Sequence, residues 1–210
     1  MKIKYPRTHH LPWSPGVSDD DQVMADLSFL RAADRIVVTV KMDGENTTLY
    51  HDGLHARSLD SAAHPSRTHV KQMHAALAHE IPRGWRVCGE NLYARHSIAY
   101  KNLPAYFLAF SVWDDRNVCL SWDATLEWLT LIGLKAVPVL YDGPFDEAVL
   151  RTLFRSTHLG DEMEGFVVRV AGEFPFEDFQ RAVGKYVRKG HVQTSEHWMH
   201  GPVIANKLGT

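Results

Sequence analysis

Lys41 is the residue whose type and setting most clearly suggest covalent chemistry. It ends an apolar, β-branched run, and the turn-forming pair Asp43 and Gly44 follows at once. A strand end projects its side chain from a rigid support, and a lysine amine can act as a nucleophile. An ordinary lysine is almost fully protonated at neutral pH, so it needs desolvation or a nearby positive charge to react. A metal ion held by acidic residues would supply that charge.

Three acidic residues stand beside expected strands and are candidates to hold the metal ion: Asp43, Glu90 and Glu164. Burying an unpaired carboxylate is costly, so Glu90 should have a partner. The alternatives are a structural ion pair for Glu90 and simple turn chemistry for Asp43. Lys-x-Asp-Gly also precedes ordinary turns, so this motif alone does not establish a nucleophile.

The elements that must position these residues alternate between strands and helices. Strands are expected at 35–41, 46–50, 54–58, 85–93, 105–113, 136–141, 165–170 and 185–188. Helices are expected at 65–81 and 145–154 and after the capping residue Ser121. Ser18 and the aspartates after it predict a further helix, with Met24, Leu27 and Leu30 on its apolar face. Mostly antiparallel strands with interspersed helices indicate an α+β fold.

Size and composition are those of one ordinary globular domain. The chain has 210 residues, 45% hydrophobic and 23% charged, and we expect a single domain over 1–210 with no appended OB-fold or helical domain. Cys88 and Cys119 allow neither a disulfide framework nor a cysteine metal site and favour buried thiols in a reducing cytosol. No secretory signal or bilayer-length apolar run is visible, so we expect no membrane contact and a cytoplasmic location.

Charge is distributed unevenly along the chain. A net charge of -2 argues against nucleic-acid binding over the whole surface. After residue 180, however, the single acid Glu196 is outnumbered by five basic residues: Arg181, Lys185, Arg188, Lys189 and Lys207. His191, His197 and His200 lie in the same stretch. A local phosphate-binding patch and a solvated basic tail both fit this pattern. None of the thirteen histidines belongs to a His-Glu-x-x-His zinc motif.

Five short motifs, in this chain order, resemble those of the covalent nucleotidyltransferases, which are RNA ligases, DNA ligases and mRNA capping enzymes. They are Lys41-Met-Asp-Gly44, Cys88-Gly-Glu-Asn-Leu-Tyr93, Phe107-Leu-Ala-Phe110, Glu164-Gly-Phe-Val-Val-Arg169 and Lys185-Tyr-Val-Arg188. Asn46 is typical of RNA ligases, whereas the other two classes usually carry arginine two positions after the motif glycine. Arg57 stands where RNA ligases place an arginine that contacts phosphate or ribose. Residues 5–8 and 191–198 are also similar to stretches in some of these ligases.

The resemblance implies a nucleotidyltransferase domain, similar to ATP-grasp folds, in which the nucleotide cleft lies between antiparallel sheets flanked by helices. It implies that Lys41 takes AMP from ATP and that Asp43 orients Lys41 or contacts the ribose. Glu90 would bind a ribose hydroxyl, and Phe110 would stack on adenine. The RNA partner would offer a 5′-phosphate and a 3′-hydroxyl, either as separate ends or at a nick in a duplex.

The remaining roles concern charge. By resemblance, Glu164 and Glu90 would hold Mg2+ or Mn2+, and Lys185 would neutralise the α-phosphate. Asn46 and Arg57 would hold phosphates, while Arg169 and Arg7 are weaker candidates that also suit surface ion pairs.

The sequence departs from the family pattern at two positions. Val187 stands where many relatives have a second lysine, and Val40 offers no contact that would select ATP over GTP. A DNA ligase, a capping-type enzyme and a non-catalytic module that binds nucleotides or RNA ends remain alternatives.

Overall fold

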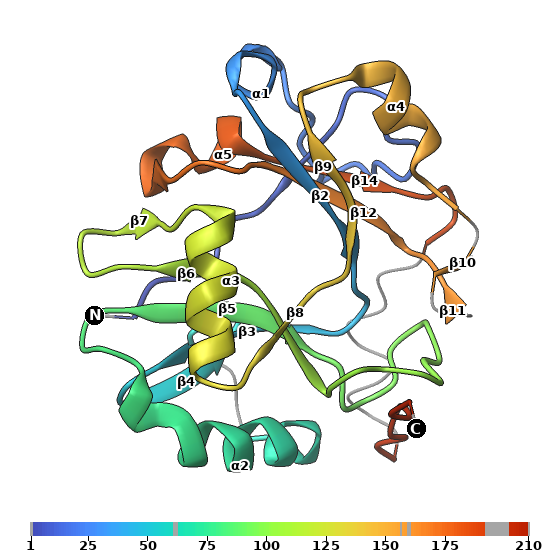
Figure 1. Ribbon diagram of the computed structural model, residues 1–210. Coiled ribbons are helices and arrows are strands. Elements are labelled where there is room, and N and C mark those ends of the chain that lie inside the picture. Colours follow the sequence, from blue (N-terminus) through green and yellow to red (C-terminus); the bar gives the residue numbers. More distant parts are fainter. Residues whose placement is uncertain (1, 61–62, 156, 159–160, 192–201, 210) are drawn as a thin grey trace.

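The computed structural model describes residues 2–60, 63–155, 157–158, 161–191 and 202–209. Two β-sheets dominate it (Figure 1). The smaller sheet contains β1 (His9–His10), β2 (Ile36–Lys41), β9 (Val139–Gly143), β12 (Gly165–Val170) and β14 (Val183–Val187). The larger contains β3 (Glu45–Tyr50), β4 (Gly53–Ala56), β5 (Arg86–Asn91), β6 (Phe107–Trp113), β7 (Val118–Cys119), β8 (Lys135–Ala136) and β13 (Phe174–Pro175).

The remaining elements are helices and one small hairpin. The helices are α1 (Ser28–Ala32), α2 (Thr68–Leu77), α3 (Trp122–Leu131), α4 (Glu147–Thr152) and α5 (Phe179–Ala182). The hairpin is formed by β10 (Thr157–His158) and β11 (Asp161–Glu162). None of the helices in the described part of the chain is long and apolar enough to cross a membrane.

Strand order and pairing confirm the expected α+β class. The smaller sheet runs β1-β14-β12-β2-β9, and the larger runs β13-β7-β6-β5-β3-β4 with β8 also on β6. The pairs β1–β14 and β6–β8 are parallel, whereas the long neighbours β2–β12, β12–β14, β3–β5 and β5–β6 are antiparallel. Most of this connectivity joins strands that are distant in sequence, so the fold depends on long-range contacts.

Side chains along the strands of the larger sheet alternate between its two faces, and each face packs into a different hydrophobic core. Val87 and Val112 pack with α2 and α3 on the outer face (Figure 1). Cys88 and Leu108 point the other way, into the main core shared with the smaller sheet. The inner face of the larger sheet and the smaller sheet are therefore the two surfaces available to hold a ligand between them.

Two expectations about secondary structure were wrong. The strand predicted at 136–141 is two strands, β8 and β9, in different sheets, because Pro138 has no N–H for a continuous ladder and the chain crosses between sheets there. The helix predicted from Ser18 is absent, and α1 begins only at Ser28. The Ser18 hydroxyl instead donates to Asp21 Oδ2 over 2.7 Å, which closes a turn.

Two glycines of the sequence motifs are required by close approaches of the backbone. A Cβ at Gly165 would lie 1.9 Å from the carbonyl oxygen of Tyr186 in the neighbouring β14. A Cβ at Gly44 would lie 2.6 Å from the carbonyl oxygen of Asn91 in β5. Both positions exclude a side chain because backbone atoms cannot move aside easily.

Replacing Gly165 with alanine should therefore destabilise the fold. We expect Gly165→Ala to lower the free energy of unfolding by about 1–3 kcal/mol, the usual cost of overpacking a filled site, as measured by denaturant unfolding. Gly172→Ala is the matched control, since a Cβ there would have no neighbour within 4 Å. Equal stability of the two variants would contradict the strand spacing described here.

Candidate functional site

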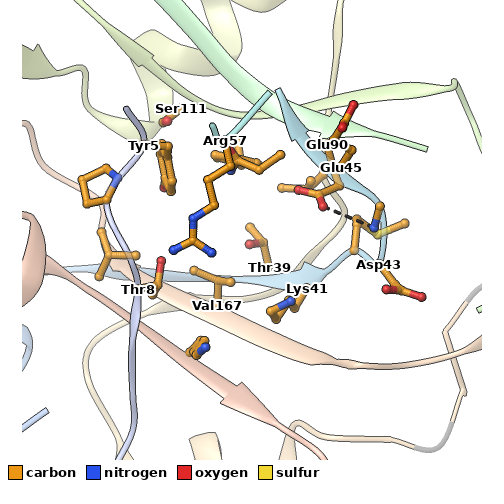
Figure 2. A pocket seen from close by; sticks show the side chains of 18 of the residues that line it. Tyr5, Thr8, Thr39, Lys41, Asp43, Glu45, Arg57, Glu90, Ser111 and Val167 are labelled. Carbon is orange, nitrogen blue, oxygen red and sulfur yellow. Dashed lines mark hydrogen bonds between the residues drawn. The ribbon is translucent and has the colours of Figure 1, made fainter. Parts of the chain in front are cut away.

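A cavity of about 540 Å³ lies between the two sheets. Every residue proposed from sequence to be catalytic or to bind nucleotide or metal lines it: Lys41, Asp43, Asn46, Arg57, Glu90, Phe110, Glu164 and Lys185. Figure 2 labels four of them, Lys41, Asp43, Arg57 and Glu90. The candidate residues lie on or beside strands of both sheets, in three separate parts of the sequence: 41–57, 90–110 and 164–185. The structure thus brings these residues together at one cavity, and the role of each side chain remains a prediction.

The register of the smaller sheet places the two motif lysines near each other. Gly165 on β12 lies between Lys41 on β2 and Val187 on β14. One step along the same face, Val167 lies between Thr39 and Lys185. Residues two apart on a strand share a face, so Lys41 and Lys185 both face the cavity.

The Lys41 amine is held by carboxylates. Its Nζ donates to Glu164 Oε1, and the Glu164 side chain is only 1% exposed. Burial would lower the pKa of Lys41, but the carboxylates of Glu164, Glu90 and Asp43 outweigh burial and raise it. The acids by themselves therefore keep the amine charged.

Glu90 is held beside the Lys41 loop. Its Oε1 accepts a hydrogen bond from the Gly44 backbone N–H at 3.2 Å (Figure 2). Burial raises the pKa of Glu90 to about 8, an effect that Lys41 partly offsets and that Glu164 and Asp43 increase. At neutral pH, and with no cation nearby, Glu90 therefore carries a proton more often than an exposed glutamate does.

Asp43 does more than form a turn. Its Oδ2 accepts hydrogen bonds from the Ser97 hydroxyl and from the Ile98 N–H, both at 2.7 Å. The Asp43 N–H donates to the Tyr100 hydroxyl at 2.9 Å. These bonds fix the carboxylate and leave its Oδ1 facing Glu164 and His191.

Asp43, Glu164 and His191 form a group that can hold a metal ion, with ligand atoms all within 4.8 Å of one another. Glu164 Oε2 is buried and has no hydrogen-bond partner among the described residues, which fits a site built for a cation. The group does not include Glu90, which sequence reasoning had paired with Glu164. Sequence reasoning noted His191 as part of a basic tail and of a stretch similar to some ligases, but not as a metal ligand, and His197, His200 and Glu196 lie outside the described residues.

Lys185 is positioned by the N-terminal segment. Its Nζ lies 3.0 Å from Asp21 Oδ1, and Asp21 Oδ2 lies 3.2 Å from His10 Nε2. Burial lowers the pKa of Lys185, and the Asp21 carboxylate opposes that shift. Asp21 therefore keeps a buried lysine cationic inside the cavity.

The same N-terminal segment is fastened along β14. β1 pairs with β14 in parallel, with His10 beside Lys185. His10 Nδ1 is 2.8 Å from Ser14 Oγ, which accepts a hydrogen bond from the Val187 N–H at 2.9 Å. Sequence reasoning missed His10, Ser14 and Asp21 because no spacing connects them to Lys185, more than 160 residues away.

A β-bulge directs Phe110 into the cavity. On β5, Cys88 pairs with Ser111 of β6, whereas the next residue, Gly89, pairs with Ala109. Phe110 is therefore the extra, unpaired residue of β6. The Tyr5 ring stands edge-on to Phe110, with centroids 5.2 Å apart. Phe110 thus lines the cavity with Tyr5 as its neighbour, a position compatible with an aromatic ligand.

Arg57 and Asn46 offer polar groups to the same space. The Arg57 side chain extends into the cavity from the side opposite Lys41 (Figure 2). Asn46 Oδ1 is buried and has no hydrogen-bond partner among the described residues, so it is available to a ligand.

The weaker arginine candidates have structural partners. Arg169 donates to the carbonyl oxygens of Val170 and Leu120 at 2.9 and 2.8 Å, and Arg7 donates to that of Asp20. Arg188 pairs with Glu162 at 3.0 Å, so this contact gives no replacement for the lysine that relatives carry at Val187.

Solved structures with the same fold are RNA ligases. The Naegleria gruberi RNA ligase with PPi matches with a TM-score of 0.55 and 17% identity over 90% of this chain and 61% of that chain. A variant of that ligase with ATP and Mn matches at 0.53 and 18%, over 82% and 56%. An archaeal ATP-dependent RNA ligase matches at 0.56 and 16%, over 88% and 48%. The chain therefore spans 48–61% of the length of these structures.

These likenesses define the fold as the nucleotidyltransferase fold of RNA ligases, in agreement with the sequence motifs. The family model for RNA ligase matches residues 34–187, most of the chain. The chain belongs to the RNA ligase family. A search of curated proteins finds no significant match.

Removing the Asp21 carboxylate should loosen Lys185. We expect Asp21→Asn to lower the free energy of unfolding by about 1–3 kcal/mol and to lower the pKa of Lys185 further, as measured by denaturant unfolding and by NMR titration of the lysine amine. Asp20→Asn is the control, since Asp20 is 77% exposed and pairs with a half-exposed Arg7. An unchanged Lys185 titration in Asp21→Asn would contradict the role of this pair.

Glu90 should make the stability of the metal-free protein depend on pH. Its folded pKa of about 8 lies above the ordinary 4.5, so the folded state binds the proton more tightly and stability falls as pH rises across that interval. We expect metal-free Glu90→Gln to melt at least about 3 °C above the wild type at pH 8, with a smaller gap at pH 5.

Glu127→Gln, on the exposed face of α3, controls for the loss of one charge in that experiment. Calorimetry at both pH values in the presence of a chelator is the measurement. A gap of the same size at pH 5 and pH 8 would show that Glu90 does not titrate abnormally.

Proposed function

We propose that this chain is an ATP-dependent RNA ligase that carries AMP covalently on Lys41. One observation supports this most directly: the Lys41 amine contacts the buried Glu164 at the wall of a cavity that Lys185 and Arg57 also line. A nucleophilic amine, a metal-binding carboxylate and two phosphate-binding cations in one cavity suit nucleotidyl transfer.

In the first step, the uncharged Lys41 Nζ attacks the α-phosphorus of ATP. A P–N bond forms, the bond between the α-phosphorus and the bridging oxygen to the β-phosphate breaks, and pyrophosphate leaves. The amine loses one proton before the attack and another on forming the phosphoramidate. Lys185, kept cationic by Asp21, stabilises the negative charge that builds up on the α-phosphate oxygens.

A divalent cation bound at Asp43 and Glu164 would neutralise charge on the phosphates and offset the carboxylates that now raise the pKa of Lys41. The protein's own contribution is to hold these carboxylates at fixed positions. The Ser97 and Ile98 hydrogen bonds hold Asp43, and burial beside β12 holds Glu164.

Two further steps complete ligation. An oxygen of an RNA 5′-phosphate attacks the phosphorus of the Lys41 adduct, which frees the amine and forms a pyrophosphate-linked adenylylated end. A 3′-hydroxyl then attacks the RNA phosphorus, the phosphodiester forms, and AMP leaves. Asn46 and Arg57 are placed in the cavity to hold the RNA phosphate after pyrophosphate has gone. We place this activity in the cytoplasm, in keeping with two buried free thiols.

Loss of the Lys41 amine should abolish the covalent adduct. With α-labelled ATP and Mg2+ or Mn2+, we expect wild-type protein to carry label through denaturing electrophoresis, and both Lys41→Ala and Lys41→Arg to carry none. The arginine variant keeps a positive charge next to Glu164, so it separates loss of the nucleophile from loss of the ion pair.

Lys71→Ala, on the exposed face of α2, is the control and should label like the wild type. Parallel reactions with labelled GTP, and with nicked DNA in place of RNA ends, distinguish the capping-type and DNA-ligase alternatives. A folded wild-type protein that forms no adduct with either nucleotide would refute the proposal and favour a binding module.

A further inference from the structure

His191 is the group at the carboxylate end of the cavity to which the family motifs assign no role. It lies four residues beyond the end of β14, and its side chain is only 2% exposed. Its Nε2 lies 3.2 Å from Glu164 Oε1 and 3.8 Å from Asp43 Oδ1. Its Nδ1 is also buried, with no hydrogen-bond partner among the described residues. The Nε2 nitrogen of this buried imidazole thus lies close to the carboxylates of both Asp43 and Glu164.

The spacing of His191 Nε2 from the two carboxylate oxygens suits one metal ion. With metal–ligand bonds of about 2.1 Å in an octahedral site, adjacent ligand atoms lie roughly 3 Å apart and opposite ones roughly 4.2 Å. The separations of 3.2 and 3.8 Å fall within that range. Asp43 would need little rearrangement to bind, since it already holds its two hydrogen bonds through the other oxygen. Glu164 would share Oε1 with the Lys41 amine or offer Oε2, which has no hydrogen-bond partner among the described residues.

The kinds of ligand atom then determine which metal binds best. Mg2+ prefers oxygen ligands and keeps much of its water shell, whereas imidazole nitrogen suits first-row transition metals better. We infer that His191 binds the catalytic metal directly through Nε2 and that the site therefore prefers a first-row divalent metal such as Mn2+ to Mg2+. The metal's role in catalysis rests on the proposed ligase function, but its binding can be measured without nucleotide.

Electron paramagnetic resonance of Mn2+ tests the inference on the full chain after chelator treatment. Titration of the free Mn2+ signal gives the affinity, and competition with Mg2+ gives the preference. Electron spin-echo modulation reports a nitrogen bound to Mn2+. We expect modulation by one imidazole nitrogen in the wild type and at least a tenfold preference for Mn2+. We expect a loss of about tenfold or more in Mn2+ affinity in His191→Ala.

Two further variants keep the test informative if His191→Ala folds poorly. His191→Asp gives an all-oxygen site, and we expect it to lose the nitrogen signal and to narrow the preference for Mn2+. His96→Ala changes another histidine that lines the cavity but lies outside the metal group, and we expect it to keep the signal.

Wild-type protein that binds Mn2+ without nitrogen modulation would overturn the inference, as would His191→Ala with wild-type affinity. Either result would mean that His191 only pairs with the carboxylates. Nitrogen-bound Mn2+ in a protein that forms no Lys41 adduct would refute the ligase proposal but keep this one. A Lys41 adduct in a protein that binds Mn2+ without nitrogen coordination would refute the inference about His191 but keep the ligase proposal.

Discussion

The contact between the Lys41 amine and the Glu164 carboxylate is the interaction on which the site depends. It joins β2 to the residue just before β12, and it is possible because Gly165 lies beside Lys41 in register. A side chain at Gly165 would separate β12 from β14 and disturb both lysines. The Glu-Gly motif thus combines a charged group and a backbone constraint in adjacent residues.

The N-terminal segment completes the cavity although it lies outside the part of the chain that matches the family model. Asp21, which also contacts His10, holds the Lys185 amine, and Tyr5 stands beside Phe110. A buried lysine costs less when a carboxylate faces it, so the fold of residues 5–24 and the charge of Lys185 depend on each other.

Sequence predicted well what is local. The strands around Lys41 and Glu164 follow from β-branched runs and turn residues, and the motif residues indicated which side chains would meet. Sequence-based prediction failed where the local structure depends on a side chain that is distant in the sequence. The Ser18 turn forms because Asp21 pairs with Lys185 rather than beginning a helix. His191 becomes a candidate metal ligand only because the fold brings it beside Asp43 and Glu164. The bulge at Phe110 arises from the pairing between β5 and β6.

The balance of charge in the cavity argues for nucleotide and metal binding together. Asp43, Glu90 and Glu164 gather around Lys41, and burial, with a further contribution from the charges of Glu164 and Asp43, raises the pKa of Glu90. A triphosphate alone would add negative charge near these acids, and a cation alone would add positive charge to a cavity that Lys185 and Arg57 already line. A metal–triphosphate complex supplies both charges at once, so it relieves both ends of the cavity in one binding event. In the proposed mechanism the same complex would free the Lys41 amine from its carboxylate neighbours, which would couple binding to activation of the nucleophile.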